Sequence, residues 1–374
     1  MGEIFDAPGI IVVKVGSSTL VDAQGSPDRD FIAGLCAQVA QLRGEGHGVA
    51  VVSSGAVAAG MERLGMDVRP LDMPGLQACA SAGQAALTEV YADILSAYHI
   101  PCGQVLLTRR DLVDRKGYLN ARNTLGRLLS LGAVPVVNEN DTVSVAEFAF
   151  GDNDTLGAIV ATLINADLYV ILSDVDGLYT ANPQSDPEAR LVSRVEAITP
   201  EVAAMATGAG SAVGTGGMAA KVRAARAALS AGIPTVICRG RRAGSLLEAA
   251  HGEGVGTRFE PSDGSAPESA RKLWIGLAEV PHGTIWLDEG ACTAVASRGA
   301  SVLPVGVTRV EGDYAAGDVV NVMAPDGVLV GRGITRYSSE EMVRVHGLKL
   351  DVIARFMPEK DGAVAIHRNE LLVF

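Results

Sequence analysis

Two of the chain's six lysines stand next to glycine-containing turns, where an ammonium group can bind a phosphate. Lys14 closes an apolar run two residues before the Gly-Ser-Ser of residues 16–18, and Lys221 follows the glycine-rich residues 214–217. The backbone N–H groups of such turns attract anions, and a lysine adds a compact positive charge. The two positions predict a phosphate site. The ordinary alternatives are a strand-end lysine that reaches to solvent and a solvated surface lysine.

Two clusters of polar residues contain carboxylates that can pair with these lysines. Residues 138–141 contain two carboxylates, and residues 152–154 contain two more. Asn and Asp at this density usually form turns, but carboxylates here can also position lysines, orient an amino group or hold Mg²⁺ through water. Ser173 and Asp174 end another apolar run and predict a nucleotide contact, with the same turn alternative.

Two well-known phosphate motifs are not supported. No lysine follows a glycine, so the Gly-x-x-x-x-Gly-Lys-Ser/Thr loop of P-loop NTPases is absent. Residues 214–219 match the Gly-x-Gly-x-x-Ala form of a dinucleotide fingerprint. However, no convincing strand precedes them, and Cys238 and Arg239 stand where an acidic residue is required. A dehydrogenase is therefore disfavoured.

Predicted strands and helices, which must position these groups, alternate along the first 258 residues. Short β-branched runs, several of which end in a polar or glycine turn, lie at 9–20, 49–55, 103–108, 134–138, 167–174 and 234–238 and are separated by helical patterns such as 74–98. Both faces of the runs are apolar, which is typical of a parallel sheet covered by helices on each side. We therefore predict an α/β fold with a mainly parallel central sheet sandwiched by helices.

The pattern changes after residue 258. Residues 259–273 are rich in Pro, Ser and Gly and predict a linker. Residues 274–374 contain short strand candidates with frequent turns, at 283–288, 301–310, 318–323, 327–334 and 362–367. This pattern predicts a small β-rich barrel. The expected domains are thus 1–258 and 274–374.

The amino-acid composition disfavours several classes of protein function. The net charge of −12 and an aromatic content of 4% disfavour a protein that binds nucleic acid through many phosphates or stacked bases. The five cysteines are scattered, which disfavours a disulfide framework or a thiolate metal site. No apolar run reaches the length of a membrane span, and no signal peptide is visible. We expect a cytoplasmic protein without a membrane partner.

Six motifs appear in the order found in the amino acid kinase family, which the chain resembles over nearly its whole length. They are KVGSS at 14–18, VSSGAVAAG at 52–60, VNENDTV at 137–143, GDND at 151–154, LSDVDGLYTANP at 172–183 and GTGGMAAK at 214–221. The third and fourth motifs resemble the branch that phosphorylates the side-chain carboxylate of glutamate, rather than the aspartate, acetylglutamate, uridylate or carbamate kinases. The tail resembles a PUA domain.

The resemblance implies transfer of the ATP γ-phosphoryl to L-glutamate, the first step of proline biosynthesis. Lys14 and Lys221 would stabilise the transferring phosphoryl, and Asp154 would hold both lysines. The implied glutamate-binding residues are Ser54, Asp141, Asn153 and Asp152. The implied ATP-binding residues are Lys14, Ser173, Asp174, Thr215, Gly216, Gly217, Met218, Ala219, Ala220 and Lys221. Mg²⁺ would be held mainly through the ATP phosphates, with no dedicated protein ligands.

The resemblance further implies feedback inhibition by proline beside the glutamate site, in the loop from Asn138 to Asp154, and a homo-oligomer such as a dimer or tetramer. Two alternatives stay open from the sequence. One is a kinase of another amino-acid carboxylate such as aspartate. The other is an RNA-associated protein that acts through the PUA-like tail, although the tail carries a net negative charge.

Overall fold

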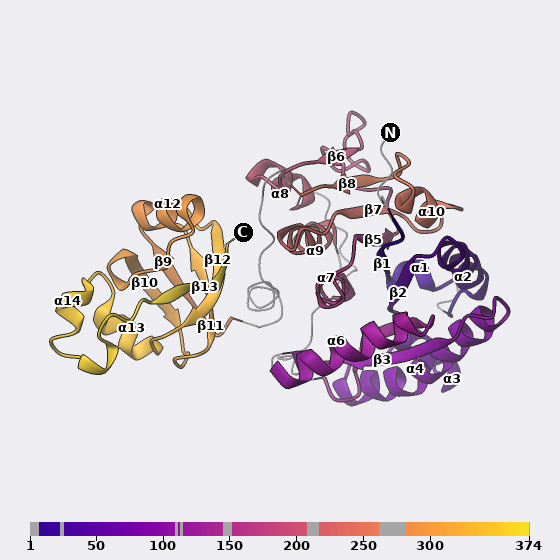
Figure 1. The fold of residues 1–374 in the computed structure, drawn as a ribbon, viewed down its shortest axis with the longest axis horizontal. Coiled ribbons are helices and arrows are strands. Elements are labelled where there is room, and N and C mark those ends of the chain that lie inside the picture. The colour runs from indigo at the N-terminus through magenta and orange to yellow at the C-terminus, as the bar shows by residue number, and fades with distance from the viewer. Residues whose placement is uncertain are drawn as a thin grey trace. The chain divides into compact units, whose positions relative to one another are not determined.

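The computed structural model describes residues 7–22, 26–108, 111–112, 115–144, 152–207, 217–261 and 281–373. The chain divides into two compact units, Met1–Pro267 and Glu268–Phe374 (Figure 1). Each unit has its own sheet and its own core. No helix among the described residues is long and apolar enough to cross a membrane.

The first unit alternates strands and helices. In chain order its elements are β1 (Ile10–Val15), α1 (Ser17–Leu20), α2 (Arg29–Gly44), β2 (Gly48–Ser53), α3 (Ala56–Arg63), α4 (Met73–Ser96), β3 (Cys102–Leu107), α6 (Arg115–Ser130), β4 (Val134–Glu139), α7 (Asn153–Leu163), β5 (Leu168–Ser173), β6 (Arg194–Val195), α8 (Pro200–Thr207), α9 (Met218–Ser230), β7 (Thr235–Arg239), α10 (Ser245–Ala250) and β8 (Thr257–Phe259).

The predicted mainly parallel sheet is confirmed. Its eight strands lie in the order β3-β4-β2-β1-β5-β7-β8-β6, and every pair is parallel except β7 with β8. The order places β1 at the centre, between β2 and β5. Because the strand is covered on both faces, its apolar side chains after the half-buried Ile10 are fully buried, as the β-branched run requires.

The two faces of the sheet have different roles. Ile11, Val13 and Val15 of β1 pack into the core formed with α2, α4 and α10. Successive side chains of a strand point to opposite faces, so Lys14 projects to the other side, the face covered by α7 and α9 (Figure 1). The hydrophobic pattern therefore directs this lysine toward the helices of one face.

Aspartates begin three of the described helices of the first unit. Asp28, Asp72 and Asp152 are N-caps whose carboxylates accept hydrogen bonds from the backbone N–H three residues later. For α7 this bond runs from Thr155 N to Asp152 Oδ1 at 2.6 Å. The cap fixes the point at which α7 begins, and with it the direction of the side chains in its first turn.

Helices α3 and α4 approach closely because glycines face each other at their crossing. A Cβ atom on Gly83 would overlap the carbonyl oxygen of Ala56 and the backbone nitrogen of Gly60, and a Cβ on Gly60 would overlap the carbonyl group of Cys79. Only glycine allows the two backbones to come so near. The contact fixes the position of α4, which is the helix next to β3.

Gly83→Ala is therefore expected to destabilise the protein by more than the about 1–3 kcal/mol typical of an overpacked core, because two backbones must separate. Thermal or urea unfolding measures the effect. The control is Gly126→Ala in α6, where a Cβ meets no atom within 4 Å; a helical Gly-to-Ala change there should stabilise by up to about 1 kcal/mol. Equal stability of the two variants would show that the helices tolerate the added carbon.

The second unit is built on a five-stranded sheet in the order β10-β9-β11-β12-β13. Its elements are β9 (Gly283–Leu287), α12 (Glu289–Arg298), η1 (Pro304–Gly306), β10 (Val307–Gly312), β11 (Val319–Met323), β12 (Leu329–Thr335), α13 (Ser339–Val345), α14 (Leu350–Ile353), η2 (Pro358–Lys360) and β13 (Ile366–Val373). The prediction of a β-rich second domain is confirmed.

Two details of the tail differ from the sequence prediction. The last strand runs over Ile366–Val373, not 362–367, and Gly362 stands in a left-handed turn before it, with φ of +68°. The strand expected at 301–310 begins only at Val307, because Pro304 starts a short 3₁₀ helix. In both cases a turn residue inside the apolar run shortened or displaced the strand.

Candidate active site

The carboxyl ends of neighbouring parallel strands form one edge of the first unit's sheet. Strands β5, β1, β2 and β4 lie side by side there, so the polar residues that follow them are brought together. A cavity of about 690 Å³ opens among these residues and the starts of α7 and α9. This is the edge at which ligands bind in open α/β sheets.

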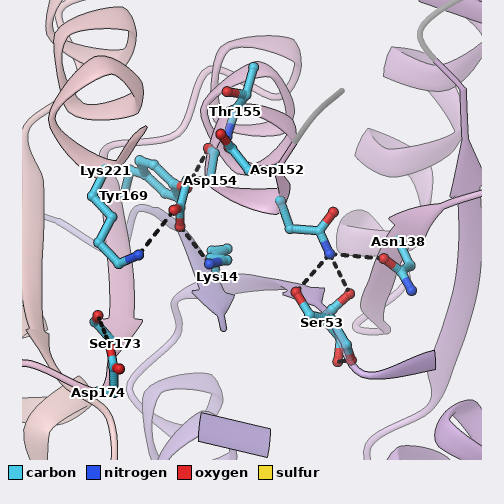
Figure 2. A network of polar contacts seen from close by, with 12 residues as sticks. Lys14, Ser53, Asn138, Asp152, Asp154, Thr155, Tyr169, Ser173, Asp174 and Lys221 are labelled. Atoms are coloured by element: carbon cyan, nitrogen blue, oxygen red, sulfur yellow. Dashed lines mark hydrogen bonds and ion pairs between the residues drawn. The ribbon is translucent and has the colours of Figure 1, made fainter. Parts of the chain in front are cut away.

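A buried ion-pair cluster lines the cavity. The Nζ atom of Lys14 is 2.5 Å from Oδ1 of Asp154, and Nζ of Lys221 is 3.3 Å from Oδ2 of the same carboxylate. Figure 2 shows the two lysines approaching Asp154 from different elements, β1 and α9. All three residues are buried, and Asp154 is fully so. Side chains 207 residues apart in the sequence thus share one partner.

Helix α7 places Asp154 where a negative charge is favoured. The residue lies in the first turn, so the unpaired N–H groups and the dipole of the helix stabilise its carboxylate. Its backbone carbonyl also accepts a hydrogen bond from the Tyr169 hydroxyl at 2.8 Å, beneath the helix (Figure 2). Asp154 is therefore held in place both through its carboxylate and through its backbone carbonyl.

The cluster carries more positive than negative charge. Two ammonium groups share one carboxylate, which leaves a net charge of +1 among three buried side chains. Ammonium groups brought together in this way can donate charge-assisted hydrogen bonds to the oxygens of an anion. The cluster is suited to bind a phosphoryl group between its two lysines.

A second polar group lines another part of the cavity. The Asn153 amide nitrogen donates to Ser54 Oγ at 2.8 Å, to Asn138 Oδ1 at 3.0 Å and to the Ser53 carbonyl at 3.1 Å. Ser54 and Asn153 both line the cavity. The structure therefore brings together two of the predicted substrate residues, next to the lysine cluster.

Two predicted substrate carboxylates have raised pKa values. Burial and the charge of Asp154 raise the pKa of Asp152, although its bond from Thr155 works in the opposite direction. Burial and the nearby Glu139 raise the pKa of Asp141 to about 6. Asp152 lines the cavity, whereas Asp141 is not among the described lining residues and lies on the turn that follows β4.

The predicted nucleotide residues are partly described. Ser173 at the end of β5 donates to Asp174 Oδ1 at 3.0 Å, and both line the cavity (Figure 2). Gly217 and Met218, at the start of α9, line it as well. Ala219 and Ala220 belong to the same turn but are not lining residues. Thr215 and Gly216 lie outside the described residues.

The cavity also contains residues that the sequence analysis did not single out. Arg69 lies on the loop between α3 and α4, and Tyr179 and Met205 lie beyond β5. Tyr179 was part of a quoted motif, so its proximity to Ser173 was a usable signal. Arg69 and Met205 lie in segments that contain no recognisable sequence motif.

Within the described residues, no group of three His, Cys, Asp or Glu side chains is placed to hold a metal ion. Both oxygens of Asp154 are already paired with lysines. Among the described lining residues, Asp152 and Asp174 are the other carboxylates that could contact a metal ion.

Comparisons with known proteins agree with this geometry. Residues 9–239 match the amino acid kinase family, and residues 283–357 match the PUA domain. The carbamate kinase from Giardia lamblia bound to AMP-PNP shares the fold, with a TM-score of 0.50 and 18% identity over 69% of this chain and 100% of that chain.

Curated relatives resemble the chain over both units. A protein named glutamate 5-kinase from Geobacter sp. (strain M21) is 45% identical over 363 residues, 97% of each chain. Another of that name, from Cupriavidus metallidurans, is 47% identical over the same share of both chains. The chain therefore belongs to the amino acid kinase family, and within it to the group of proteins named glutamate 5-kinase.

Proposed function

We propose that this chain transfers the γ-phosphoryl group of ATP to the side-chain carboxylate of L-glutamate, giving γ-glutamyl phosphate for proline biosynthesis. The observation that carries the proposal is the buried cluster of Lys14, Asp154 and Lys221, which brings two ammonium groups together at one carboxylate inside a cavity. Relatives named glutamate 5-kinase, matched over 97% of this chain, support glutamate as the substrate.

In the reaction, a carboxylate oxygen of glutamate forms a bond to the γ-phosphorus as the bond to the β-phosphate oxygen breaks and ADP leaves. The nucleophile is already ionised at neutral pH, since a glutamate side chain has a pKa of about 4.3. No general base is needed, so the protein's task is to align the reactants and to stabilise the charge on the transferring group. Lys14 and Lys221 serve the second task, and Asp154 keeps both ammonium groups directed at the same point.

The cavity fits ATP that carries its own Mg²⁺. The lysine-paired Asp154 has no oxygen left for a metal, so the ion is held mainly by phosphate oxygens, with Asp152 and Asp174 as the carboxylates within the cavity. When bound, Mg²⁺ neutralises phosphate charge and lowers the repulsion between the two anionic reactants.

We assign the two groups of cavity residues to the two reactants. Ser173, Asp174 and the start of α9 at residues 217–221 bind the nucleotide, and residues 215 and 216 precede them in the chain. Ser54, Asn153 and Asp152 bind glutamate, with Asp141 at its amino group. The lysine cluster lies with both groups in one cavity, where the phosphoryl group would pass from one reactant to the other.

ADP release measured separately with glutamate, aspartate and N-acetylglutamate tests the substrate. Hydroxylamine added to the same reactions traps an acyl phosphate as a hydroxamate. We expect hydroxamate from glutamate and little from the other two acids. Activity only on another acid would contradict the proposal and favour the alternative kinase of a different carboxylate.

The raised pKa of Asp141 gives a pH prediction. Its carboxylate binds the substrate ammonium only when ionised, so ionisation is complete well above pH 6 and is lost below it. The KM for glutamate should then rise by up to about tenfold for each pH unit below 6, while the KM for ATP changes less. Steady-state kinetics between pH 5 and 8 measure both.

Asp141→Asn provides the control for this prediction. It should raise the KM for glutamate at pH 8 and remove most of its rise at low pH, because the titrating group is gone. A wild-type KM that stays constant from pH 5 to 8 would show that Asp141 does not contact the substrate.

Three further properties are part of the proposal. Proline is expected to compete near the glutamate end of the cavity, in the loop from Asn138 to Asp154, of which residues 145–151 lie outside the described part. A homo-oligomer is expected, as is a cytoplasmic location, in keeping with five cysteines that form no disulfide. RNA binding by the second unit stays an alternative without a supporting contact.

A further inference from the structure

Arg69 is the third positively charged residue among the described residues that line the cavity, besides Lys14 and Lys221. The two lysines share the carboxylate of Asp154, whereas Arg69 forms no hydrogen bond or ion pair with any described residue. A guanidinium group has five N–H donors in a planar fork, which suits it to bind an anionic group such as a carboxylate. The donors of Arg69 are thus available to a ligand in the cavity.

The order of the strands places Arg69 on the side of the cavity that we assign to glutamate. Strands β2 and β4 lie on one side of β1, and β5 lies on the other. The nucleotide residues Ser173 and Asp174 lie at the end of β5, whereas α3 and the loop that carries Arg69 follow β2. Near the start of α4, Gln77 donates to the Ser144 carbonyl at 3.1 Å, which joins this region to the turn after β4. The loop therefore belongs to the glutamate side.

The backbone that carries Arg69 is fixed at the start of α4. Pro70 restricts its own φ angle and also the conformation of the residue before it. It packs against α4 so closely that a Cβ atom on Gly75 would lie 2.7 Å from the Pro70 Cβ. Asp72 caps the helix by accepting a hydrogen bond from Gly75 N at 2.8 Å. A side chain presented from a fixed backbone loses less entropy when it binds a ligand.

Glutamate has three charged groups at neutral pH, and each needs a partner in the cavity. Its side-chain carboxylate is the nucleophile, so it must face the phosphoryl group at Lys14 and Lys221. Its ammonium group is assigned to Asp141. Among the described lining residues, Arg69 is the cation that remains for its α-carboxylate.

We propose that Arg69 binds the α-carboxylate of glutamate and selects acids that carry this group. The inference rests on the proposed function and deepens it. The α-carboxylate does not react, so this contact has the same strength in the ground state and in the transition state. It therefore lowers the KM for glutamate and leaves kcat unchanged.

Arg69→Gln tests this role, because it removes the charge and keeps a polar side chain at an exposed position. We expect the KM for glutamate to rise about tenfold, which corresponds to about 1.4 kcal/mol. The KM for ATP and the kcat at saturating glutamate should stay within about twofold. Arg69→Lys keeps a positive charge without the paired donors, so its KM for glutamate should lie between those of the wild type and Arg69→Gln.

Arg63→Gln is the matched control. Arg63 lies on α3, does not line the cavity, and has an exposed ion pair with Glu89 at 3.2 Å. Such a pair contributes little, so this variant should keep the KM for glutamate, the KM for ATP and kcat within about twofold of the wild type. Melting temperatures of all three variants should match that of the wild type, which separates a binding defect from a loss of stability.

L-isoglutamine identifies the group of the substrate that Arg69 recognises, because it carries a neutral amide in place of the α-carboxylate. The ratio of kcat/KM for glutamate over isoglutamine should fall about tenfold in Arg69→Gln. An unchanged ratio or an unchanged KM for glutamate would overturn the inference. A loss of kcat or an equal rise in the KM for ATP would also overturn it, since either places Arg69 at the phosphates. A wild-type protein that does not phosphorylate glutamate would refute the proposed function instead, so the two failures are distinguishable.

Discussion

Replacement of either Lys14 or Lys221 by methionine is expected to lower kcat by about 100- to 1,000-fold, the range seen when one preorganised donor to a developing charge is removed. Methionine keeps the buried volume and removes the ammonium group. Because the transferring phosphoryl gains stabilisation mainly in the transition state, the KM for glutamate should change much less than kcat. Steady-state kinetics with saturating ATP measure the effect.

Lys116→Met is the matched control, since Lys116 is an exposed residue of α6 and does not line the cavity. It should leave kcat within about twofold. The double variant of Lys14 and Lys221 should lose less than the product of the two single losses, because both groups act on one phosphoryl and share one carboxylate. A single variant that keeps kcat within about tenfold of the wild type would contradict the proposed role.

Asp154→Asn should reduce both activity and stability. Asparagine keeps the shape but removes the negative charge that the two buried ammonium groups share. Breaking a buried pair in this way typically costs about 3–5 kcal/mol of unfolding free energy. The lysines also lose the group that aligns them, so kcat should fall by at least about 100-fold. Urea unfolding and kinetics measure the two effects.

The comparison for this variant is Asp93→Asn, at an exposed position of α4. Exposed charges contribute little, so both readouts should stay close to those of the wild type. Full activity of Asp154→Asn would show that the lysines keep their positions without the carboxylate. Unchanged stability would show that the ammonium groups are solvated, in disagreement with their burial.

The fold could be predicted largely because the strands of the first unit are buried on both faces. Runs such as Ile10–Val15 place apolar side chains on both faces of the strand. This pattern is typical of a parallel sheet that is covered by helices on each side. The tail was predicted less well, because each of its strands is short and a single Pro304 or Gly362 displaces a boundary. Its helices α12 to α14 have few residues and weak periodicity.

The candidate site could be predicted where chemistry and local geometry coincide. Lys14 interrupts an apolar strand, and Asp154 follows an N-cap at a helix start, so both have a local signature. What the residues alone did not show is that Lys14 and Lys221 meet at one carboxylate, since that depends on the order of the strands. The family resemblance supplied that pairing.

Other site residues have no signature of their own. Tyr169 looks like any core aromatic, and its contact with the carbonyl of Asp154 follows from the packing of α7 on β5. Gln84 lies within α4, and its side chain contacts Thr88 and Asn138, which are 4 and 54 residues away. Polar residues that act through long-range hydrogen bonds are found only once the tertiary structure is known.

A crystal structure of the protein with glutamate, Mg²⁺ and a non-hydrolysable ATP analogue is the most direct test of the central claim. The account predicts that the Nζ atoms of Lys14 and Lys221 both lie within hydrogen-bonding distance, about 3.2 Å or less, of oxygens on the terminal phosphate. It also predicts that Asp154 stays between them. Nitrogen atoms that contact different ligands, or a terminal phosphate away from both, would contradict it.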